Sequence, residues 1–380
     1  MLVRALKFTG FRNLAPASLE PGPRFNVFAG NNGQGKTNLL EALYAVCTLR
    51  SFRSSRLKDL ISIHGEQAYV GARVARGGLE RRYELTINAR SRVVRLDNKA
   101  VRPIAKYFGD FNVVLFAPED LLVAKGSPGE RRRFLDRAVF TLRPSFLAIA
   151  QDFEKVLRSR NVVLRDEQLS SSSKEGMLSV YDHQLAKLSA QILRARLEYL
   201  NSVQGRFAKA FEAITRSGLP TTLRYEASGE VVRAEQFQDI PSLEALETAY
   251  AAAFVASRRA DLGRGSTNVG PHRDVLLFEL AGQPAGNFAS QGQLRAMILA
   301  WKTAEMDLLA DVHEDPPALL LDDVSSELDP KRNEYLFEFL RGRQNQCFIS
   351  TTHPKFVLLE KDRRDFTVEN GQIEVSSSSL

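Results

Sequence analysis

Cysteine is scarce in this 380-residue chain, which has only Cys47 and Cys347. Two thiols so far apart in the sequence form neither a disulfide framework nor a clustered metal motif, and they indicate a reducing cytosol. The chain also lacks any run of about 18 apolar residues, which excludes a membrane-spanning helix. Residues 1–8 alternate and carry charge, as a strand does and a signal peptide does not. We therefore expect a cytoplasmic protein without a membrane partner.

The bulk composition is that of an ordinary globular chain. Hydrophobic residues make up 44% and charged residues 26% of the sequence, so the chain can bury a sizeable core. The length suggests two or three domains.

Positive charge gathers in one stretch. The net charge of the chain is +7, and the segment 50–106 contains 14 Lys and Arg against 5 Asp and Glu. A basic face attracts a polyanion, most often nucleic acid, although a solvated β-rich surface without a partner has the same composition. If the partner is DNA, the candidates for phosphate contacts are Arg53, Arg56, Arg73, Arg76 and Arg92.

The first 120 residues have the pattern of strands with one helix. A short apolar run at 24–29 ends at a glycine, and helical spacing follows over 37–49. The segment 69–96 predicts a meander of strands with a turn at 77–78.

The middle of the chain, from about 129 to 217, is almost wholly helical in pattern. An apolar seam repeats every seven residues, at Leu178, Leu185, Ile192 and Tyr199. A serine-rich break at 170–176 separates this helix from the preceding one. The pattern fits an antiparallel helical arm, and it fits an ordinary helical subdomain equally well.

Strands and helices alternate after residue 220, which is typical of a parallel sheet. The pattern predicts helices at 290–309 and 331–340 and strands at 318–321 and 347–350.

A phosphate-binding loop follows the apolar run at 24–29 and opens the next helix. Its residues fit the pattern G-x-x-x-x-G-K-[ST] and are Gly30, Asn31, Asn32, Gly33, Gln34, Gly35, Lys36 and Thr37. Glycines let backbone N–H groups wrap the phosphates, and a helix N-terminus favours an anion. Lys36 can reach the β- and γ-phosphates, and Thr37 can ligate Mg²⁺. The strand–loop–helix context makes the signal specific and predicts ATP with Mg²⁺.

Two carboxylates end the apolar strand at 318–321. A parallel strand delivers such acids to the sheet edge beside the phosphate loop. There Asp322 would hold the Mg²⁺ shell, and Asp323 would orient or deprotonate the attacking water. Without a phosphate loop, the same pattern would indicate an ordinary strand followed by an acidic helix cap.

Two further segments have a functional and a structural interpretation. Ser290 and Gln293 form a capping box, and the same helix N-terminus, which includes Gly292, can also face a phosphate. His353 follows the strand at 347–350, where a γ-phosphate sensor is expected, although a lone histidine after a strand is usually structural.

The order of these motifs resembles that of the ABC ATPase superfamily, in its SMC and DNA-repair branch. Four more segments are similar to signatures of the RecF family, and they lie at 11–14, 126–136, 269–274 and 320–329. The matching segments run from residue 3 to about 356, so the resemblance covers nearly the whole chain.

The resemblance implies an α/β fold, namely an ABC/SMC-type ATPase head. This head has a phosphate-loop parallel sheet and a β meander, with an inserted helical subdomain. The expected parts are the N-terminal half of the head (1–128), a helical arm (129–217) and the C-terminal half of the head (218–380).

The resemblance also implies a function. RecF-like proteins are cytoplasmic, bind duplex DNA near single-strand gaps and junctions in an ATP-dependent way, and form a homodimer around two ATPs. They act with RecO and RecR to help load RecA, and they belong to recombinational repair, replication restart and the SOS response. In such a dimer, Ser290, Gly292 and Gln293 would meet the γ-phosphate bound by the other subunit, and a weak ATPase activity would reset the complex.

Some positions depart from the family pattern. Leu294 follows the signature where glutamine is usual, and Tyr181 stands where tryptophan is expected. Asp323 replaces the glutamate of most ABC proteins, and only this change touches the chemistry. A carboxylate shortened by one methylene lies farther from the water, which predicts slow turnover.

Two other functions fit a phosphate loop. One is the ATPase subunit of a membrane transporter, which the helical insertion, the basic stretch and the signature disfavour. The other is a small-molecule kinase, which has no use for a signature helix acting on a partner's nucleotide.

Overall fold

The computed structural model describes residues 1–54, 56–234, 237–312 and 315–376. The chain forms two compact units, one from Met1–Asp120 with Met306–Leu380 and the other from Leu121–Glu305. The chain passes from the first to the second through the 3-10 helix η3 (Pro118–Lys125), and it returns along helix α7 (Gln291–Val312).

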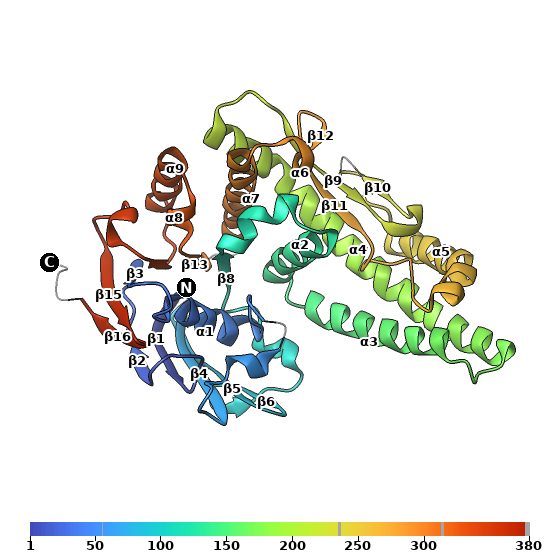
Figure 1. Cartoon of the computed structure of the whole chain (residues 1–380), viewed down its shortest axis with the longest axis horizontal. Coiled ribbons are helices and arrows are strands. Elements are labelled where there is room, and N and C mark those ends of the chain that lie inside the picture. Colours follow the sequence, from blue (N-terminus) through green and yellow to red (C-terminus); the bar gives the residue numbers. More distant parts are fainter. Residues whose placement is uncertain (55, 235–236, 313–314, 377–380) are drawn as a thin grey trace. The chain divides into compact units, whose positions relative to one another are not determined.

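The first unit contains a sheet with the strand order β16-β15-β3-β14-β13-β8 (Figure 1). The parallel members are β3 (Phe25–Ala29), β8 (Val113–Phe116), β13 (Ala318–Asp322), β14 (Cys347–Thr351) and β15 (Arg363–Glu369). Strand β16 (Gln372–Val375) is antiparallel to β15. β13 and β14 are buried at every position, as strands covered on both faces are. The parallel sheet expected from the sequence is confirmed, and it interleaves strands from both ends of the chain.

The second sheet of this unit is antiparallel and has the order β2-β1-β4-β5-β6-β7. Its strands are β1 (Leu2–Thr9), β2 (Ala17–Leu19), β4 (Gln67–Arg76), β5 (Leu79–Asn88), β6 (Arg92–Leu96) and β7 (Lys99–Ala100). The meander expected at 69–96 is confirmed, with its first turn at the predicted position. Side chains alternate between a buried and a solvated face, which is typical of an antiparallel sheet with one covered face.

Helix α1 (Lys36–Thr48) is the centre of this unit. Eleven of its 13 residues are buried, and its apolar side chains share one core cluster with residues of both sheets. A helix covered all round has little need of an amphipathic pattern. The smaller helices of the unit are α8 (Val324–Glu327), α9 (Pro330–Arg341) and the 3-10 turns η1 (Leu57–Leu60), η2 (Ile104–Tyr107) and η5 (Pro354–Phe356).

The second unit combines long helices with a small sheet. The helices are α2 (Pro128–Leu142), α3 (Phe146–Arg165), α4 (Ser171–Thr215), α5 (Leu243–Arg264), α6 (Ala285–Phe288) and most of α7. The sheet has the order β10-β9-β11-β12, from β9 (Thr221–Glu226), β10 (Arg233–Ala234), β11 (Val275–Leu280) and β12 (Gln283–Pro284), with η4 (Ser228–Glu230) between β9 and β10. Aromatic rings surround the fully buried Trp301 in its core, namely Phe134, Tyr199, Phe207 and Phe278.

The heptad seam falls on α4, and all four of its residues named from the sequence are buried. Figure 1 shows α4 running beside α3 and α5. The break expected at 170–176 is wrong in extent. Ser170 is the N-cap of α4 and accepts a hydrogen bond from Ser173 N, so the serines begin the helix. The compact unit is also wider than the segment 129–217, because it includes the small sheet and α5.

Candidate functional site

The phosphate-binding loop lies between β3 and α1. Gly35 caps α1 with φ of 114°, a conformation that side-chain-bearing residues rarely adopt. Gly30 is packed against β15, because a Cβ added there would lie 2.2 Å from the carbonyl oxygen of Val368. Gly30 and Gly35, the two glycines that the pattern fixes, are therefore required by the local geometry.

Lys36 lies within the loop that it serves. Its Nζ donates to the carbonyl oxygens of Gly30 at 2.7 Å and Asn31 at 2.9 Å. Burial lowers the pKa of the Lys36 ammonium, while the nearby carboxylates of Asp323 and Asp322 act to raise it. The sequence motifs at the two ends of the chain thus meet at this lysine.

Asp322, the last residue of β13, connects the phosphate loop to strand β14. Its Oδ1 accepts hydrogen bonds from Thr37 Oγ1 at 2.8 Å and from Ser350 Oγ at 2.6 Å. Burial raises the pKa of the Asp322 carboxyl, and these two hydroxyl donors oppose that shift. The negative charge of Glu119, which follows β8, raises the pKa of Asp322 further.

Ser350 and Glu119 were not singled out from the sequence. Ser350 pairs with Asp322 in the register of β13 and β14, so the parallel sheet brings them together. The sequence did offer a signal for Ser350. Two parallel strands were expected to end at one edge of the sheet, and Ser350 is the last residue of the expected strand at 347–350, so it would lie near the acids that follow the other strand.

Asp323 begins helix α8 in a left-handed conformation, with φ of 49°. Aspartate tolerates this region better than most residues with a longer side chain. Its backbone N donates to Ser350 Oγ at 2.9 Å, and its Oδ1 is buried with no hydrogen-bond partner within the described part of the chain. Burial raises the pKa of this carboxyl. An unpartnered buried acceptor beside the phosphate loop fits a role toward a bound water.

The donors at this site fit a polyphosphate with a divalent cation. The first turn of α1 presents backbone N–H groups and a lysine, while Thr37 and Asp322 offer a hydroxyl and a carboxylate. Across the described ranges, no group of three or more His, Cys, Asp or Glu side chains could hold a metal ion by itself. Mg²⁺ in phosphate sites takes one or two protein carboxylates and completes its shell with water and phosphate oxygens.

Gln34 supports the loop from the other side. Its Oε1 accepts from Asn370 N at 2.5 Å, and its carbonyl oxygen accepts from Gly371 N at 2.9 Å. The Gln34 side chain therefore contacts the turn between β15 and β16.

His353 follows β14 by two residues. Its Nδ1 accepts from Lys355 N at 3.3 Å, and its ring contacts Phe356, so the histidine caps η5. His353 therefore has a structural contact, and its role as a phosphate sensor stays a prediction.

Ser290 begins α7 with the capping box expected from the sequence. Gln293 N donates to Ser290 Oγ at 3.2 Å, and Ser290 N donates to Gln293 Oε1 at 2.8 Å. Ser290 is exposed, and Gly292 lies in the first turn. A phosphate contact made by this helix start stays a prediction.

The five candidate arginines do not share one surface. Arg73 and Arg82 face each other on the solvated side of β4 and β5, where Arg73 pairs with Glu80 at 3.3 Å. Arg92 belongs to the opposite face, because its Nη1 donates to Leu49 O at the end of α1. Successive strand residues alternate faces, so a count of basic residues in sequence overstates the charge of either side.

The other three arginines also have contacts within the chain. Arg76 donates to Gly109 O and lies near two aspartates, and it is half-buried. Arg56 pairs with Asp59 at 3.6 Å at an exposed position. Arg53 is exposed and donates to Asn38 Oδ1 at 2.9 Å. The exposed candidates are therefore Arg53, Arg56, Arg73 and Arg92, and the guanidinium of Arg92 is held at Leu49 O.

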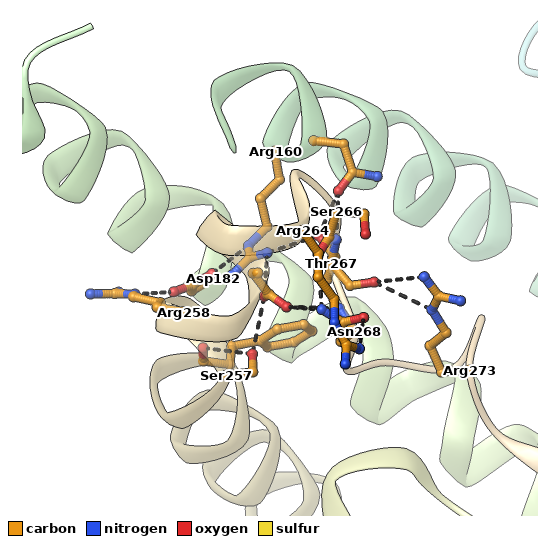
Figure 2. A network of polar contacts seen from close by, with 12 residues as sticks. Arg160, Asp182, Ser257, Arg258, Arg264, Ser266, Thr267, Asn268 and Arg273 are labelled. Carbon is orange, nitrogen blue, oxygen red and sulfur yellow. Dashed lines mark hydrogen bonds and ion pairs between the residues drawn. The ribbon is translucent and has the colours of Figure 1, made fainter. Parts of the chain in front are cut away.

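A buried ion-pair network surrounds Asp182, the residue after Tyr181. Figure 2 shows Arg160 of α3 at its centre, and Arg160 donates to Asp182 of α4 at 2.7 Å. The same guanidinium donates to Asp261 of α5 and to Thr267 Oγ1, each at 2.8 Å. Arg258 donates to the second oxygen of Asp182. These contacts fix three helices and the following loop, so Asp182 is structural here.

A second network accounts for the segment 269–274. Arg196 forms a bidentate pair with Asp136 of α2 and donates to Tyr225 at 2.9 Å. Tyr225 in turn donates to Asp274 at 2.6 Å, and Arg132 donates to the Asp274 carbonyl oxygen. Burial raises the pKa of the Asp274 carboxyl. Segments 126–136 and 269–274, which resemble the family signatures, are thus connected by this network.

The fold and the site together define a class of protein. A phosphate loop between β3 and a buried helix, the acid-ended strand β13 of the same parallel sheet and an added antiparallel sheet form an SMC/RecF-type ATPase head. The solved SMC head bound to the C-terminal winged-helix domain of ScpA has this fold, with a TM-score of 0.54, 15% identity and coverage of 100% of this chain and 99% of that one.

Sequence comparison narrows the class. The family described as RecF/RecN/SMC N terminal domain matches residues 2–373. The DNA replication and repair protein RecF of Geobacter sp. (strain M21) is 40% identical over 370 residues, which are 97% of this chain and 98% of the relative. The protein of the same name from Myxococcus xanthus (strain DK1622) is 37% identical over 384 residues, which cover 100% of this chain and 98% of that protein. This chain belongs to the RecF family of DNA replication and repair proteins.

A solved structure supports the same assignment. The recombination mediator protein RecF of the RecFOR pathway, solved with ATPrS, superposes with a TM-score of 0.88 at 28% identity, covering 99% of this chain and 98% of that one. A second structure of RecF with ATP has the same TM-score and identity. Within the described residues, no helix is both long and apolar enough to cross a membrane.

Proposed function

We propose that this chain is an ATP-dependent DNA-binding protein of recombinational repair and replication restart. The observation that carries the proposal is the contact of Thr37 and Ser350 with Asp322, beside Lys36 and the phosphate loop. This contact joins the two ends of the chain into one phosphate site. Relatives solved with ATP and ATPrS support the choice of nucleotide.

Each residue of the site has a part in holding the nucleotide. The backbone of the phosphate loop and the start of α1 would surround the β- and γ-phosphates, and Lys36 would exchange its carbonyl contacts for phosphate oxygens. Thr37 and Asp322 would hold Mg²⁺, which neutralises phosphate charge when bound. Asp322 must be ionised for this role.

Hydrolysis would reset the switch. The buried and unpartnered Oδ1 of Asp323 would accept a hydrogen bond from the attacking water, since this carboxylate is close to Lys36. Its raised pKa also favours accepting a proton. The shorter aspartate side chain leads us to expect weak ATPase activity.

Dimerisation would couple ATP to DNA. The exposed start of α7, with Ser290, Gly292 and Gln293, would meet the γ-phosphate held by a second chain, so two chains would enclose two ATPs. ATP would then favour the dimer, because it bridges the chains and ADP lacks the bridging group.

The partners follow from the family. DNA replication and repair is the role in the names of the relatives, and the solved RecF structures are of the RecFOR pathway. For this chain we infer binding to duplex DNA near single-strand gaps, with RecR and RecO as partners and RecA loading and the SOS response as the outcome. The exposed arginines Arg53, Arg56 and Arg73 are the first candidates for DNA phosphates.

The substitution Lys36→Met tests the proposal. It removes the one amine within the phosphate loop while keeping an unbranched side chain. We expect ATP binding and ATP-dependent retention of duplex DNA to be lost together, measured by nucleotide titration and by fluorescence anisotropy of a labelled duplex. A variant that binds ATP and DNA like the wild type would contradict the assignment of the site.

A further inference from the structure

A buried acid lies in the middle of α1, one turn after Thr37. The Glu41 side chain has no solvent exposure. Arg12 makes a bidentate contact with it, from Nε to Oε2 and from Nη2 to Oε1, both at 3.0 Å. The hydroxyl of Ser51 also donates to Oε1. A buried carboxylate is costly unless it is paired and hydrogen-bonded, so these contacts bind α1 firmly to the segments on either side of it.

The residue after Arg12 contacts the phosphate loop directly. Asn13 Nδ2 donates to Gly33 O at 3.1 Å. Its Oδ1 accepts from Asn38 Nδ2 at 2.7 Å. Asn13 also lies against Gly35, where an added Cβ would be 3.1 Å from Asn13 Oδ1. A shift of the loop at Gly33 therefore acts on Asn13 and, through it, on Asn38.

Asn38 also contacts an arginine of the segment after α1. Arg53 Nη1 donates to Asn38 Oδ1 at 2.9 Å, and Arg53 N donates to Ser51 Oγ at 3.0 Å. Ser54 N donates to the same hydroxyl at 2.8 Å. The segment 50–54, hereafter the arginine segment, is thus held at Ser51 through Glu41 and at Arg53 through Asn38.

These contacts form a closed circuit. It runs from the Gly33 carbonyl through Asn13 and Asn38 to the arginine segment, and it returns through Glu41 to Arg12, the neighbour of Asn13. The arginine segment displays exposed guanidinium groups at Arg50 and Arg53. A nucleotide bound at the phosphate loop and a polyanion bound at these arginines would thus both act on the hydrogen bonds between Gly33, Asn13, Asn38 and Arg53.

We propose that Asn38 and Glu41 are positioning residues that couple the phosphate loop to the arginine segment, so that nucleotide and DNA phosphate raise each other's affinity through them. The inference rests on the proposed ATP-dependent DNA binding and adds a path within one chain to the coupling through the dimer. Both act through other residues. Asn38 sets the direction of the Arg53 guanidinium, and Glu41 fixes the Ser51 hydroxyl that caps two backbone N–H groups of the segment.

The path has a measurable signature, because coupling between two ligands is reciprocal. The coupling factor is the ratio of duplex DNA affinities with and without Mg²⁺·ATP, and it equals the ratio of ATP affinities with and without DNA. Asn38→Ala removes the side chain that connects Asn13 with Arg53 and keeps a good helix former. We expect the coupling factor to fall about five- to tenfold, the range for net loss of one ordinary hydrogen bond, because the Arg53 contact is exposed. ATP affinity without DNA should stay within about twofold of the wild type.

Glu41→Gln provides the second variant, and it keeps the shape of the side chain. We expect a similar loss of coupling, together with some loss of folding stability, which circular dichroism monitors separately. Glu20→Gln is the matched control, since it makes the same change of charge at an exposed side chain of the same unit. The control should keep the wild-type coupling factor.

A double-mutant cycle tests the route itself. If Asn38 acts through Arg53, adding Asn38→Ala to Arg53→Ala should change the coupling factor no further. A wild-type coupling factor in both Asn38→Ala and Glu41→Gln would overturn the inference. An equal loss of ATP affinity in the absence of DNA would also overturn it, because these residues would then only hold the phosphate loop. A wild-type coupling factor of one would instead refute the proposed function, and with it this path.

Discussion

Ser350 offers a test of how the sheet edge prepares the site. Its hydroxyl donates to Asp322 Oδ1 at 2.6 Å and accepts from Asp323 N at 2.9 Å, so one side chain serves both acids. Ser350→Ala removes these contacts and leaves the strand intact. Asp322 then keeps one hydroxyl donor, from Thr37.

The size of the effect follows from the lost hydrogen bond. A bond to a charged group is worth about 1.5–3 kcal/mol, and the remaining Thr37 contact favours the lower end. A loss of about 1.5 kcal/mol is roughly a tenfold loss in Mg²⁺-dependent nucleotide affinity. Burial already raises the pKa of Asp322, and Ser350 opposes that rise. The substitution therefore raises this pKa further.

The raised pKa of Asp322 also predicts how nucleotide affinity changes with pH. The protonated carboxyl cannot hold Mg²⁺, so nucleotide affinity falls as the pH falls through the pKa of Asp322. In Ser350→Ala this fall should begin at a higher pH than in the wild type. Nucleotide titration with Mg²⁺ or with EDTA, over a series of pH values, measures both effects. Ser189→Ala is the matched control, because it removes a buried hydroxyl with no hydrogen-bond partner among the described residues. Unchanged affinity and an unchanged pH profile in Ser350→Ala would refute this reasoning.

Three other outcomes are expected. Asp323→Asn should bind ATP normally and hydrolyse it very slowly, while Asp322→Asn should weaken Mg²⁺-dependent binding, and nucleotide affinity and turnover measured separately distinguish the two. Alanine at the exposed candidate arginines should lower duplex affinity for all DNA sequences alike and flatten its salt dependence, since each lost phosphate contact releases fewer counterions. Burial lowers the pKa of His272 to about 4, so the unfolded chain gains this proton first as the pH falls. That difference removes about 2 kcal/mol of stability between pH 8 and pH 5, and urea unfolding of His272→Gln should lack this loss.

The phosphate site could largely be predicted from the sequence, because its parts are local. Glycine spacing, a preceding apolar run and a following helical pattern all lie within about 25 residues. The acid pair ended a run too apolar for anything but a buried strand, and the structure places it beside Lys36. The parallel order of strands followed from their alternation with helices.

The contacts between segments could not be predicted in the same way. Glu41 lies in a helix with apolar neighbours on nearly every side, and only the two flanking segments show why a carboxylate is buried there. Ser350 is an ordinary strand residue until β13 is its neighbour. Arg73 and Arg92 were grouped by sequence distance, yet the pleat directs them to opposite faces of one sheet.

Sedimentation velocity of the full chain tests the central claim most directly. The measurement compares samples with Mg²⁺·ATP, with Mg²⁺·ADP and without nucleotide. The account predicts a dimer only with ATP, further favoured by duplex DNA, and a monomer in all samples for both Lys36→Met and Ser290→Arg. Ser290→Arg should still bind ATP with near-normal affinity, since it leaves the phosphate loop of its own chain untouched. An ATP-dependent dimer formed normally by Ser290→Arg, or a wild-type chain whose mass ignores ATP, would contradict the account.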